Sequence, residues 1–255
     1  MIFISDVHHQ LEFLKLLPKK NEPLVILGDL INWIDYRNGE GIAKAVFGLE
    51  NVQKLINLRK EHRFEERKNL WKSLYSNNPE VIMKNMRDAI ENQYEEVFRI
   101  LKKYHVWFIP GNVDDVEIMN SYTSSTIKNV DGLLIEHQGT KLGFAGGGVP
   151  TPINARGEIS ENEFSKKLNK LVQAEIICTH APPYIDELMT DVVTNKIEQG
   201  WKSLLDFIKT NHPKFALFGD VHQPKASTWI VNNTKCINTG YFRATNQYLE
   251  LSSII

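Results

Sequence analysis

The sequence predicts an α/β fold in which one edge of the sheet forms a polar site. Five short apolar runs are typical of buried strands, and amphipathic helical segments lie between several of them. The runs occupy residues 2–5, 24–27, 106–109, 176–179 and 215–218. Each run ends beside an Asp, Asn or His, and residues that follow strands in α/β proteins meet at one edge of the sheet. We therefore expect these side chains to converge.

The composition limits the class of protein. Of 255 residues 42% are hydrophobic, which is enough for a substantial core. The 30 basic and 31 acidic residues leave a formal charge of −1, which argues against a large nucleic-acid-binding surface. No apolar run approaches the roughly 18 residues of a membrane helix. We expect no secretory leader, because Met1 leads directly into the strand-like segment Ile2-Phe3-Ile4. We expect a cytoplasmic protein without a membrane partner, with Cys178 and Cys236 as buried, reduced thiols.

The first half of the chain predicts two strands, a helix and an insertion. Amphipathic residues 11–17, ended by Pro18, predict a helix after the first strand. Residues 36–103 are highly charged and carry apolar stripes at helical spacing on both sides of Asn77-Asn78-Pro79, which predicts an inserted helical hairpin. A packed surface pair, a lid over the site and a contact of a homo-oligomer are three alternatives that the sequence does not separate.

The second half returns to strands and turns. Residues 133–135 and 142–145 flank Gln138-Gly139 and predict a β-hairpin, followed by a glycine loop at residues 145–148 that lets backbones approach closely. Helices at 161–172 and 200–210 lead into the fourth and fifth apolar runs. The tail segments 228–231, 235–238 and 247–251 are interpreted as closing antiparallel strands.

The residues at the strand ends are of metal-binding types. Asp6 and His8 lie two residues apart after the first run, and Asp220 and His222 repeat that pair after the fifth. The other three ends supply Gly28-Asp29, Gly111-Asn112 and Thr179-His180. Each of these alone is most simply an ordinary turn. Their conjunction, each time after an apolar run, predicts a metal centre.

In this order the residues resemble the calcineurin-like metallophosphoesterase superfamily, whose pattern is D-x-H, G-D, G-N-[HVC]-[DE], a strand-end His and G-H-x-H. The resemblance covers nearly the whole chain outside the helical insertion and includes a late Asn-x-Gly, here Asn238-Thr239-Gly240. It implies a four-layer α-β-β-α sandwich of two mixed sheets. We therefore expect a single metallophosphoesterase domain, residues 1–255, with the helical insertion at about 36–103.

The resemblance also implies two divalent metal ions and a set of ligands. The implied metal ligands are Asp6, His8, Asp29, Asn112, His180, Asp220 and His222. One ion would be held by Asp6, His8 and His222, the other by Asn112 and His180, with Asp29 bridging both. Such a set of nitrogen and oxygen ligands suits Mn, Fe, Zn or Co, with Mn expected in vitro. The catalytic residues implied are Asp29, Asn112 and His180, with Asn112 also binding substrate.

Asp220 departs from the family pattern, because it stands where the family has the first His of G-H-x-H. If Asp220 binds the second metal, three carboxylates leave two divalent ions with a net charge of about +1 instead of +2. A less positive centre attracts a dianionic monoester less and tolerates a monoanionic diester better. If Asp220 does not bind, the second site is weak.

Val113 is a second departure, because many family members have a His there that protonates the leaving group. An aliphatic side chain cannot do so. His9, which follows the ligand His8, is a candidate replacement acid, with a solvent-facing histidine as the alternative. Arg243 is a candidate for binding substrate phosphate, with an ordinary surface arginine as the alternative.

These residues predict a metal-dependent phosphoesterase that acts on a small-molecule phosphoester. A water activated by two metals attacks phosphorus directly, and both departures favour phosphodiesters. One alternative is a phosphomonoesterase acting on nucleotides or phosphoproteins. A non-catalytic scaffold of the same fold is the alternative from a different class.

Overall fold

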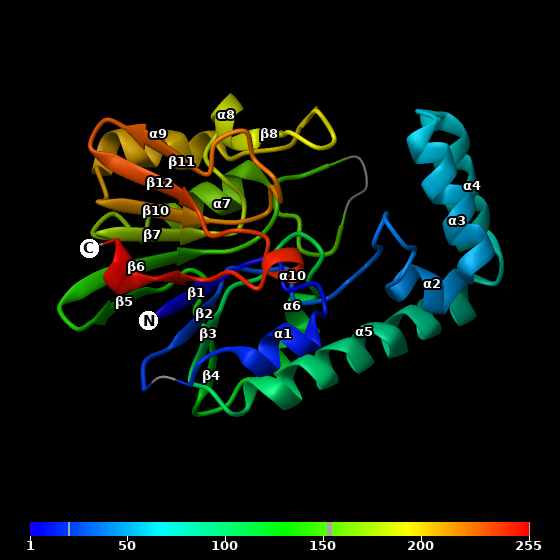
Figure 1. Ribbon diagram of the computed structural model, residues 1–255, viewed down its shortest axis with the longest axis horizontal. Coiled ribbons are helices and arrows are strands. Elements are labelled where there is room, and N and C mark those ends of the chain that lie inside the picture. The colour runs from blue at the N-terminus through cyan, green and yellow to red at the C-terminus, as the bar shows by residue number, and fades with distance from the viewer. Residues whose placement is uncertain (20, 152–154, 255) are drawn as a thin grey trace. The chain divides into compact units, whose positions relative to one another are not determined.

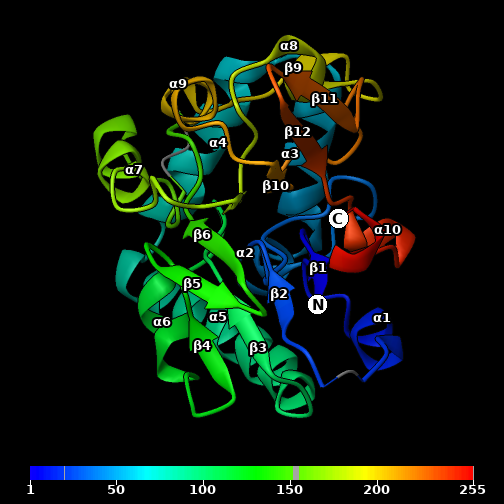
Figure 2. The same ribbon diagram turned by 90° about the vertical axis from the view of Figure 1, so that its left-hand side faces the viewer.

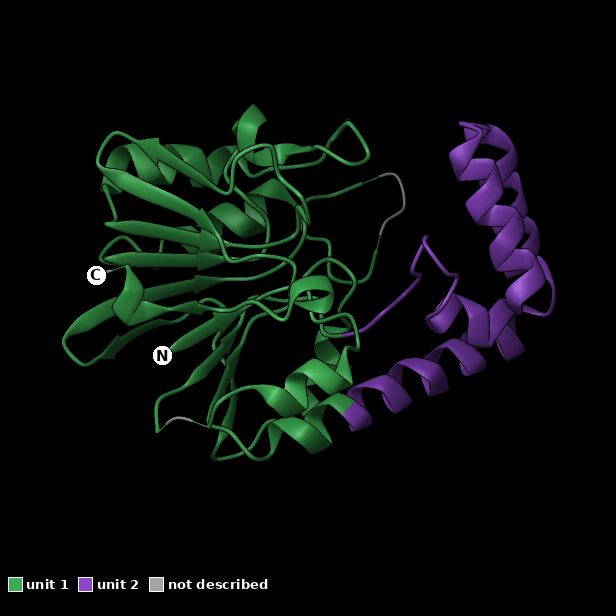
Figure 3. Ribbon diagram, viewed as in Figure 1, with its two compact units in different colours: residues 1–30, 97–255 green, residues 31–96 purple. Residues whose placement is uncertain are grey.

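The computed structural model describes residues 1–19, 21–151 and 155–254 of the chain. Its contacts divide the protein into two compact units, drawn in two colours in Figure 3. Residues 1–30 and 97–255 form the larger unit, and Ile31–Glu96 form the smaller one. The smaller unit interrupts the larger one directly after Leu30.

The larger unit contains two mixed β-sheets (Figure 1). The five-stranded sheet has the order β13-β1-β2-β3-β4, with β1 to β4 parallel and β13 antiparallel. Its strands are β1 (Ile2–Ile4), β2 (Leu24–Ile26), β3 (Val106–Phe108), β4 (Ile127–Asn129) and β13 (Leu249–Glu250). The carboxyl ends of β1, β2 and β3 therefore lie at one edge of this sheet.

The six-stranded sheet has the order β11-β12-β10-β7-β6-β5. Its four central strands are parallel, and β11 and β5 close its two edges in antiparallel pairing. Its strands are β5 (Leu134–His137), β6 (Thr140–Ala145), β7 (Ile176–Thr179), β10 (Phe215–Phe218), β11 (Thr228–Val231) and β12 (Thr234–Asn238). A separate two-stranded ribbon joins β8 (Thr190–Asp191) to β9 (Lys196–Ile197).

Apolar side chains between the layers hold the sandwich together. Phe3, Val25, Phe144 and Leu217 belong to one fully buried cluster, which fills the space between the two sheets. A second cluster joins the six-stranded sheet to α7 (Glu161–Leu168) and α9 (Lys202–Asn211). The views of Figures 1 and 2 place α1 (Leu11–Leu16) and α6 (Val116–Ser121) beyond the five-stranded sheet. The result is the expected four-layer α-β-β-α order.

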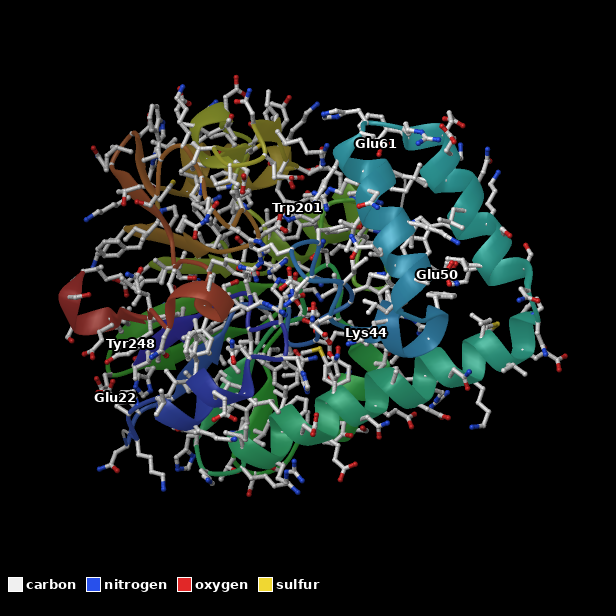
Figure 4. The ribbon with its side chains drawn as sticks, turned by 45° about the vertical axis from the view of Figure 1, so that its right-hand side comes forward. Glu22, Lys44, Glu50, Glu61, Trp201 and Tyr248 are labelled. Carbon is white, nitrogen blue, oxygen red and sulfur yellow. The ribbon has the colours of Figure 1, made fainter. Side chains whose placement is uncertain are left out.

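Burial of aromatic side chains accounts for part of this packing. Trp201, labelled in Figure 4, is fully buried and stacks on Phe164 with 4.0 Å between ring centroids. On the other side of the molecule Phe98, in the last turn of α5 (Pro79–Leu101), packs edge to face on Phe108 of β3 at 5.8 Å. Such aromatic contacts contribute about 0.5–1.5 kcal/mol beyond the area they bury.

The five apolar runs are strands, as predicted. The hairpin is also confirmed, since β5 and β6 are joined by Gln138 and Gly139 with φ of 50° and 77°. The tail segments are strands with antiparallel pairing, as predicted, and they divide between the two sheets. β11 and β12 join the six-stranded sheet, with β12 parallel to β10, whereas β13 pairs with β1 in the other sheet.

The smaller unit contains more helices than the hairpin that was predicted. Its helices are α2 (Ile42–Phe47), α3 (Leu49–Lys60), α4 (Phe64–Ser76) and the first part of α5. Gly48, with φ of 80°, separates α2 from α3, and Asn77 and Asn78 separate α4 from α5. Ala43, Phe47, Val52 and related apolar residues give the unit a small core of its own.

Two expectations drawn from composition are met within the described residues. Cys178 and Cys236 are free and buried, and burial raises the pKa of both thiols, that of Cys236 to about 12. Among the helices that the structure describes, none combines the length and apolar character that crossing a membrane requires.

The remaining short helices are α8 (Asp186–Met189), α10 (Phe242–Thr245) and the 3₁₀ turn Leu251–Ser253.

Candidate metal centre

The three aspartates among the predicted ligands share an unusual backbone conformation. Asp6, Asp29 and Asp220 have φ of 57°, 56° and 67°, in the left-handed region that few residues other than Gly, Asn and Asp enter. Each lies two or three residues after the last residue of its strand, so the left-handed residue turns the chain sharply at the sheet edge. The amide of Asp6 donates to the carbonyl of Gly28 at 3.2 Å, which ties the first two turns together.

Glycines allow these turns to pack against the ligands. A Cβ atom on Gly111 would overlap Oδ1 of Asp29, and a Cβ on Gly28 would lie 2.7 Å from Nδ1 of His180. Only glycine fits at either position without displacing a ligand. The Gly28-Asp29 and Gly111-Asn112 pairs therefore have the close backbone approach that the sequence predicted.

A first group of ligand atoms comes from Asp6, His8 and His222, whose potential ligand atoms all lie within 4.8 Å of one another. The Nε2 atoms of His8 and His222 are 3.2 Å apart. Oδ1 of Asp6 lies 3.5 Å from Nε2 of His222 and 3.8 Å from Nε2 of His8. That oxygen is buried and accepts no hydrogen bond from the described residues. A buried carboxylate oxygen facing two imidazoles fits a cation ligand.

A second group comes from Asp6, Asp29 and His180, again within 4.8 Å. Nε2 of the fully buried His180 lies 3.5 Å from Oδ1 of Asp29 and 3.4 Å from Oδ1 of Asn112. Nδ1 of His180 is 2.7 Å from the carbonyl of Leu27, so Nδ1 carries the proton and Nε2 is left to bind a cation.

Asp29 faces both groups at once. Its Oδ1 lies beside His180 of the second group, whereas its Oδ2 lies 3.6 Å from Nε2 of His8 in the first group. The amide of Val113 donates to Oδ1 at 3.1 Å and fixes the carboxylate plane. This placement is the one that a bridging ligand requires.

Asp220 lies beside the second group of ligand atoms, close to His180. Its Oδ1 is 3.6 Å from Nε2 of His180, and its backbone amide donates to Oδ2 of Asp6 at 3.0 Å. The carboxylate is therefore close to the position that a second metal ion would occupy. Asp220 does not belong to either group of mutually close ligand atoms within the described residues, which sets it slightly apart from Asp6 and Asp29.

Burial and crowding shift the ionisation of these side chains. Burial raises the pKa of Asp29 to about 8, and the carboxylates of Asp114 and Asp6 act in the same direction. Burial likewise raises the pKa of Asp220 to about 6, although His180 opposes the shift. Burial disfavours the charged form of His180, but Asp29 and Asp220 outweigh it and raise its pKa to about 9. The crowded carboxylates hold protons that divalent cations would replace.

The donor set fits two divalent ions. Donor atoms bound at about 2.0–2.2 Å from one ion lie about 3–4 Å from each other, which matches the separations of 3.2 to 3.8 Å found within the site. Imidazole nitrogens together with carboxylate and amide oxygens suit Mn, Fe, Zn or Co. The identity of the metals remains a prediction.

Asp114 holds the loops behind the second group. Its two oxygens accept hydrogen bonds from the amides of Asp29 at 2.8 Å, Leu30 at 3.0 Å and Gly111 at 2.9 Å. The side chain is fully buried. Because it binds backbone on both sides of the Asp29 turn, Asp114 fixes that turn relative to the Asn112 loop.

The positions of Arg243 and His9 do not decide between the alternative roles predicted for each residue. Nη1 of Arg243 donates to the carbonyl of His8 at 2.6 Å, so this guanidinium supports the loop that bears a ligand. His9 is half-buried, has φ of 60° and donates its amide to the carbonyl of Leu30 at 2.8 Å. Substrate binding by Arg243 and proton donation by His9 stay predictions.

The sequence analysis assigned no role to Tyr241, which lies directly against the first group. Its ring stacks on the imidazole of His222 with 3.7 Å between centroids and 1° between planes, and it meets the ring of His8 edge to face at 6.0 Å. Tyr241 and His222 are in different loops. The one available signal was the position of Tyr241 directly after the Asn-x-Gly segment at residues 238–240.

Comparison with known proteins identifies the family. A model of the family described as calcineurin-like phosphoesterase matches residues 1–224. The chain belongs to this family. Members are hydrolases of phosphoester bonds, and the Asp and His clusters supply the metal ligands that such chemistry needs. No curated protein matches the sequence.

A solved structure supports the fold. The chain is similar to the crystal structure of TT1561 of Thermus thermophilus, with a TM-score of 0.55 and 14% sequence identity. The alignment covers 97% of this chain and 96% of that chain. At this identity the similarity concerns the fold alone, and it agrees with the four-layer α-β-β-α arrangement of the family.

Proposed function

We propose that the protein is a phosphodiesterase that acts on a small-molecule diester with two divalent ions. When bound, the two ions supply a water of lowered pKa and contacts that polarise phosphate oxygens. Asp6, His8 and His222 would hold one ion, and Asn112 and His180 the other, with Asp29 between them. These side chains fix the geometry, so no covalent intermediate with the protein is required.

The observation that carries the preference for diesters is the position of Asp220. Its carboxylate lies 3.6 Å from His180, where the family pattern has an imidazole. A third carboxylate lowers the net charge of the loaded site from about +2 to about +1. The attraction to a monoester dianion falls more than the attraction to a diester monoanion, because Coulomb energy scales with the charge of the substrate.

Val113 supports the same preference. Its amide donates to Asp29, and its side chain offers no proton at the position where other family members have a histidine. A diester with a good leaving group reacts without protonation, whereas poorer leaving groups need an acid. His9, next to the ligand His8, is the residue proposed to supply that proton.

Hydrolysis of two chromogenic substrates tests the proposal. Bis(4-nitrophenyl) phosphate and 4-nitrophenyl phosphate are compared by kcat/KM with Mn²⁺, in the wild type, Asp220→His and Val113→His. The wild type is expected to favour the diester by about 10-fold or more, and Asp220→His to shift the ratio toward the monoester by roughly that factor. Asp206→His, on the exposed face of α9, is the matched control and should leave the ratio unchanged.

Two outcomes would favour the alternatives. A monoester preference in the wild type, unchanged in Asp220→His, would support a phosphomonoesterase and remove the electrostatic role of Asp220. A protein that binds no Mn²⁺ and hydrolyses neither substrate would support a scaffold of the same fold. Self-association through the helical unit stays a prediction. Sedimentation of the wild type at several protein concentrations would test it.

A further inference from the structure

The two histidines at the centre of the groups are oriented in different ways. His180 is fully buried, and its Nδ1 bonds to the carbonyl of Leu27 at 2.7 Å. The side chain of His222 is 36% exposed, and its Nδ1 makes no hydrogen bond to the described parts of the protein. A metal-binding histidine normally has its second ring nitrogen fixed by such a bond. Another contact must therefore define the ring plane of His222.

The stacked ring of Tyr241 is that contact. The planes of the two rings differ by 1° and their centroids are 3.7 Å apart, so a rotation of the imidazole about its Cβ–Cγ bond would drive it into the phenol ring. Tyr241 also meets His8 edge to face with 79° between planes. One aromatic ring thus touches both histidines of the first group.

Hydrogen bonds made by residues on both sides of Tyr241 hold its segment in place. The amides that follow it, of Phe242 and Arg243, donate to the carbonyls of Ser5 at 3.1 Å and Asp6 at 3.0 Å. On the other side, Nδ2 of Asn238 donates to the carbonyl of Val221 at 2.9 Å. The segment at residues 238–243 therefore connects the loop that bears Asp6 and His8 to the loop that bears His222.

We propose that Tyr241 is a positioning residue for the metal site of Asp6, His8 and His222, and that its ring replaces the missing hydrogen bond to His222. The inference rests on the metal ligands of the proposed function and not on the preference for diesters. The hydroxyl group is not needed for this role, because the stack involves the ring face alone. Phenylalanine should serve and an aliphatic residue should not.

Titration of the metal-free protein with Mn²⁺ tests this role. In Tyr241→Leu one of the two ions should bind about 3- to 10-fold more weakly, the factor expected for loss of one aromatic contact, while the other binds as in the wild type. Tyr241→Phe should bind both ions within about 2-fold of wild type. Tyr248→Leu, an exposed tyrosine labelled in Figure 4, is the control for losing a phenol ring elsewhere.

An NMR measurement gives a second readout that does not depend on metal. The imidazole protons of His222 should show a ring-current shift in the wild type and Tyr241→Phe that Tyr241→Leu loses. Thermal unfolding in EDTA confirms that each variant is folded. If the Tyr241→Leu variant is folded and binds both ions like the wild type, the inference on Tyr241 is overturned and the proposed function is not. Equal weakening in Tyr241→Phe and Tyr241→Leu would also overturn it, whereas loss of the diester preference with this pattern intact would leave it standing.

Discussion

The two halves of the metal centre differ in how firmly the fold holds them. Around His180, that residue and Asp29 are buried, the glycines of two loops pack against them, and Asp114 binds three amides behind them. Around His222 the side chain is more exposed, and a stacked ring and an arginine support the loops. The buried half is also the one whose residues depart from the family pattern, at Val113 and Asp220. The two departures from the pattern therefore lie in the half that the backbone holds most firmly.

Asp29→Asn should have the largest effect, because the carboxylate of Asp29 has one oxygen beside His180 and the other beside His8. An amide cannot bridge two cations as a carboxylate does, so kcat/KM for the diester should fall at least about 1000-fold. Mn²⁺ binding at both sites should weaken together. Asp206→Asn is the control. Loss of only one ion would show that the halves are independent and that Asp29 belongs to one of them.

Asp114→Asn should weaken metal binding in the buried half of the centre, although Asp114 is not one of the proposed metal ligands. The amide group can accept through only one oxygen and places an NH₂ against backbone donors, at a cost of about 2–3 kcal/mol. The melting temperature should fall by roughly 5–10 °C, and one Mn²⁺ should bind about 10- to 100-fold more weakly. The neighbouring Asp115→Asn, which caps α6 through Ile118, should leave metal affinity unchanged. Equal affinities in both variants would contradict the support role of Asp114.

The pH dependence of the metal-free protein should report the buried half. The folded pKa of Asp29 is raised to about 8, so the stability it contributes is complete below about pH 4 and is lost as the pH rises through 8. The contribution of His180, whose pKa is raised to about 9, is complete below about pH 6.5 and is lost through pH 9. Both act in one direction. They share one interaction, because Asp29 raises the pKa of His180 only when its own carboxylate is ionised, so together they contribute about 1.4 kcal/mol per pH unit.

In EDTA the melting temperature should therefore fall between pH 6 and pH 9, by roughly 5–10 °C. Mn²⁺ should reduce the dependence, because the bound ions keep the ligands deprotonated. Asp29→Asn in EDTA should show a smaller slope than the wild type. A melting temperature that rises with pH in the metal-free wild type would contradict the directions of both shifts.

Arg243→Ala should have the smallest effect and concerns the exposed half. Loss of the hydrogen bond to the carbonyl of His8 should weaken the binding of one Mn²⁺ ion by about 2- to 5-fold. KM for the diester should stay unchanged at saturating metal. Steady-state kinetics at two Mn²⁺ concentrations separate the possibilities. A KM raised about 10-fold with metal affinity intact would instead support the predicted contact with substrate phosphate.

The strand ends were predictable because their signal is local. An apolar run and the residue after it are adjacent in sequence, and parallel strands bring such residues together whatever the intervening chain contains. The helix α4 was missed because none of its residues is fully buried, and only a few side chains such as Trp71 and Leu74 pack against the core of the unit. The sequence did not indicate that β13 joins the other sheet, because that choice depends on its pairing with β1, far away in sequence.

The contacts that orient the ligands were much less accessible from the sequence. The stack of Tyr241 on His222 joins two loops and leaves no periodic or motif signal in either. Asp114 was recognisable only as a residue of the family pattern, and its three hydrogen bonds depend on loops that meet in space. Sequence thus predicted which side chains meet, and the structure shows what holds them there.

The left-handed turns at Asp6, Asp29 and Asp220 imply a trade-off between activity and stability. Asparagine adopts this conformation as readily as aspartate, so a chain with Asn at all three positions keeps each turn while losing the repulsion between buried carboxylates. A protein with these three neutral side chains should be more stable than the metal-free wild type. The gain would measure how much folding free energy the native chain forgoes to keep three acidic groups together.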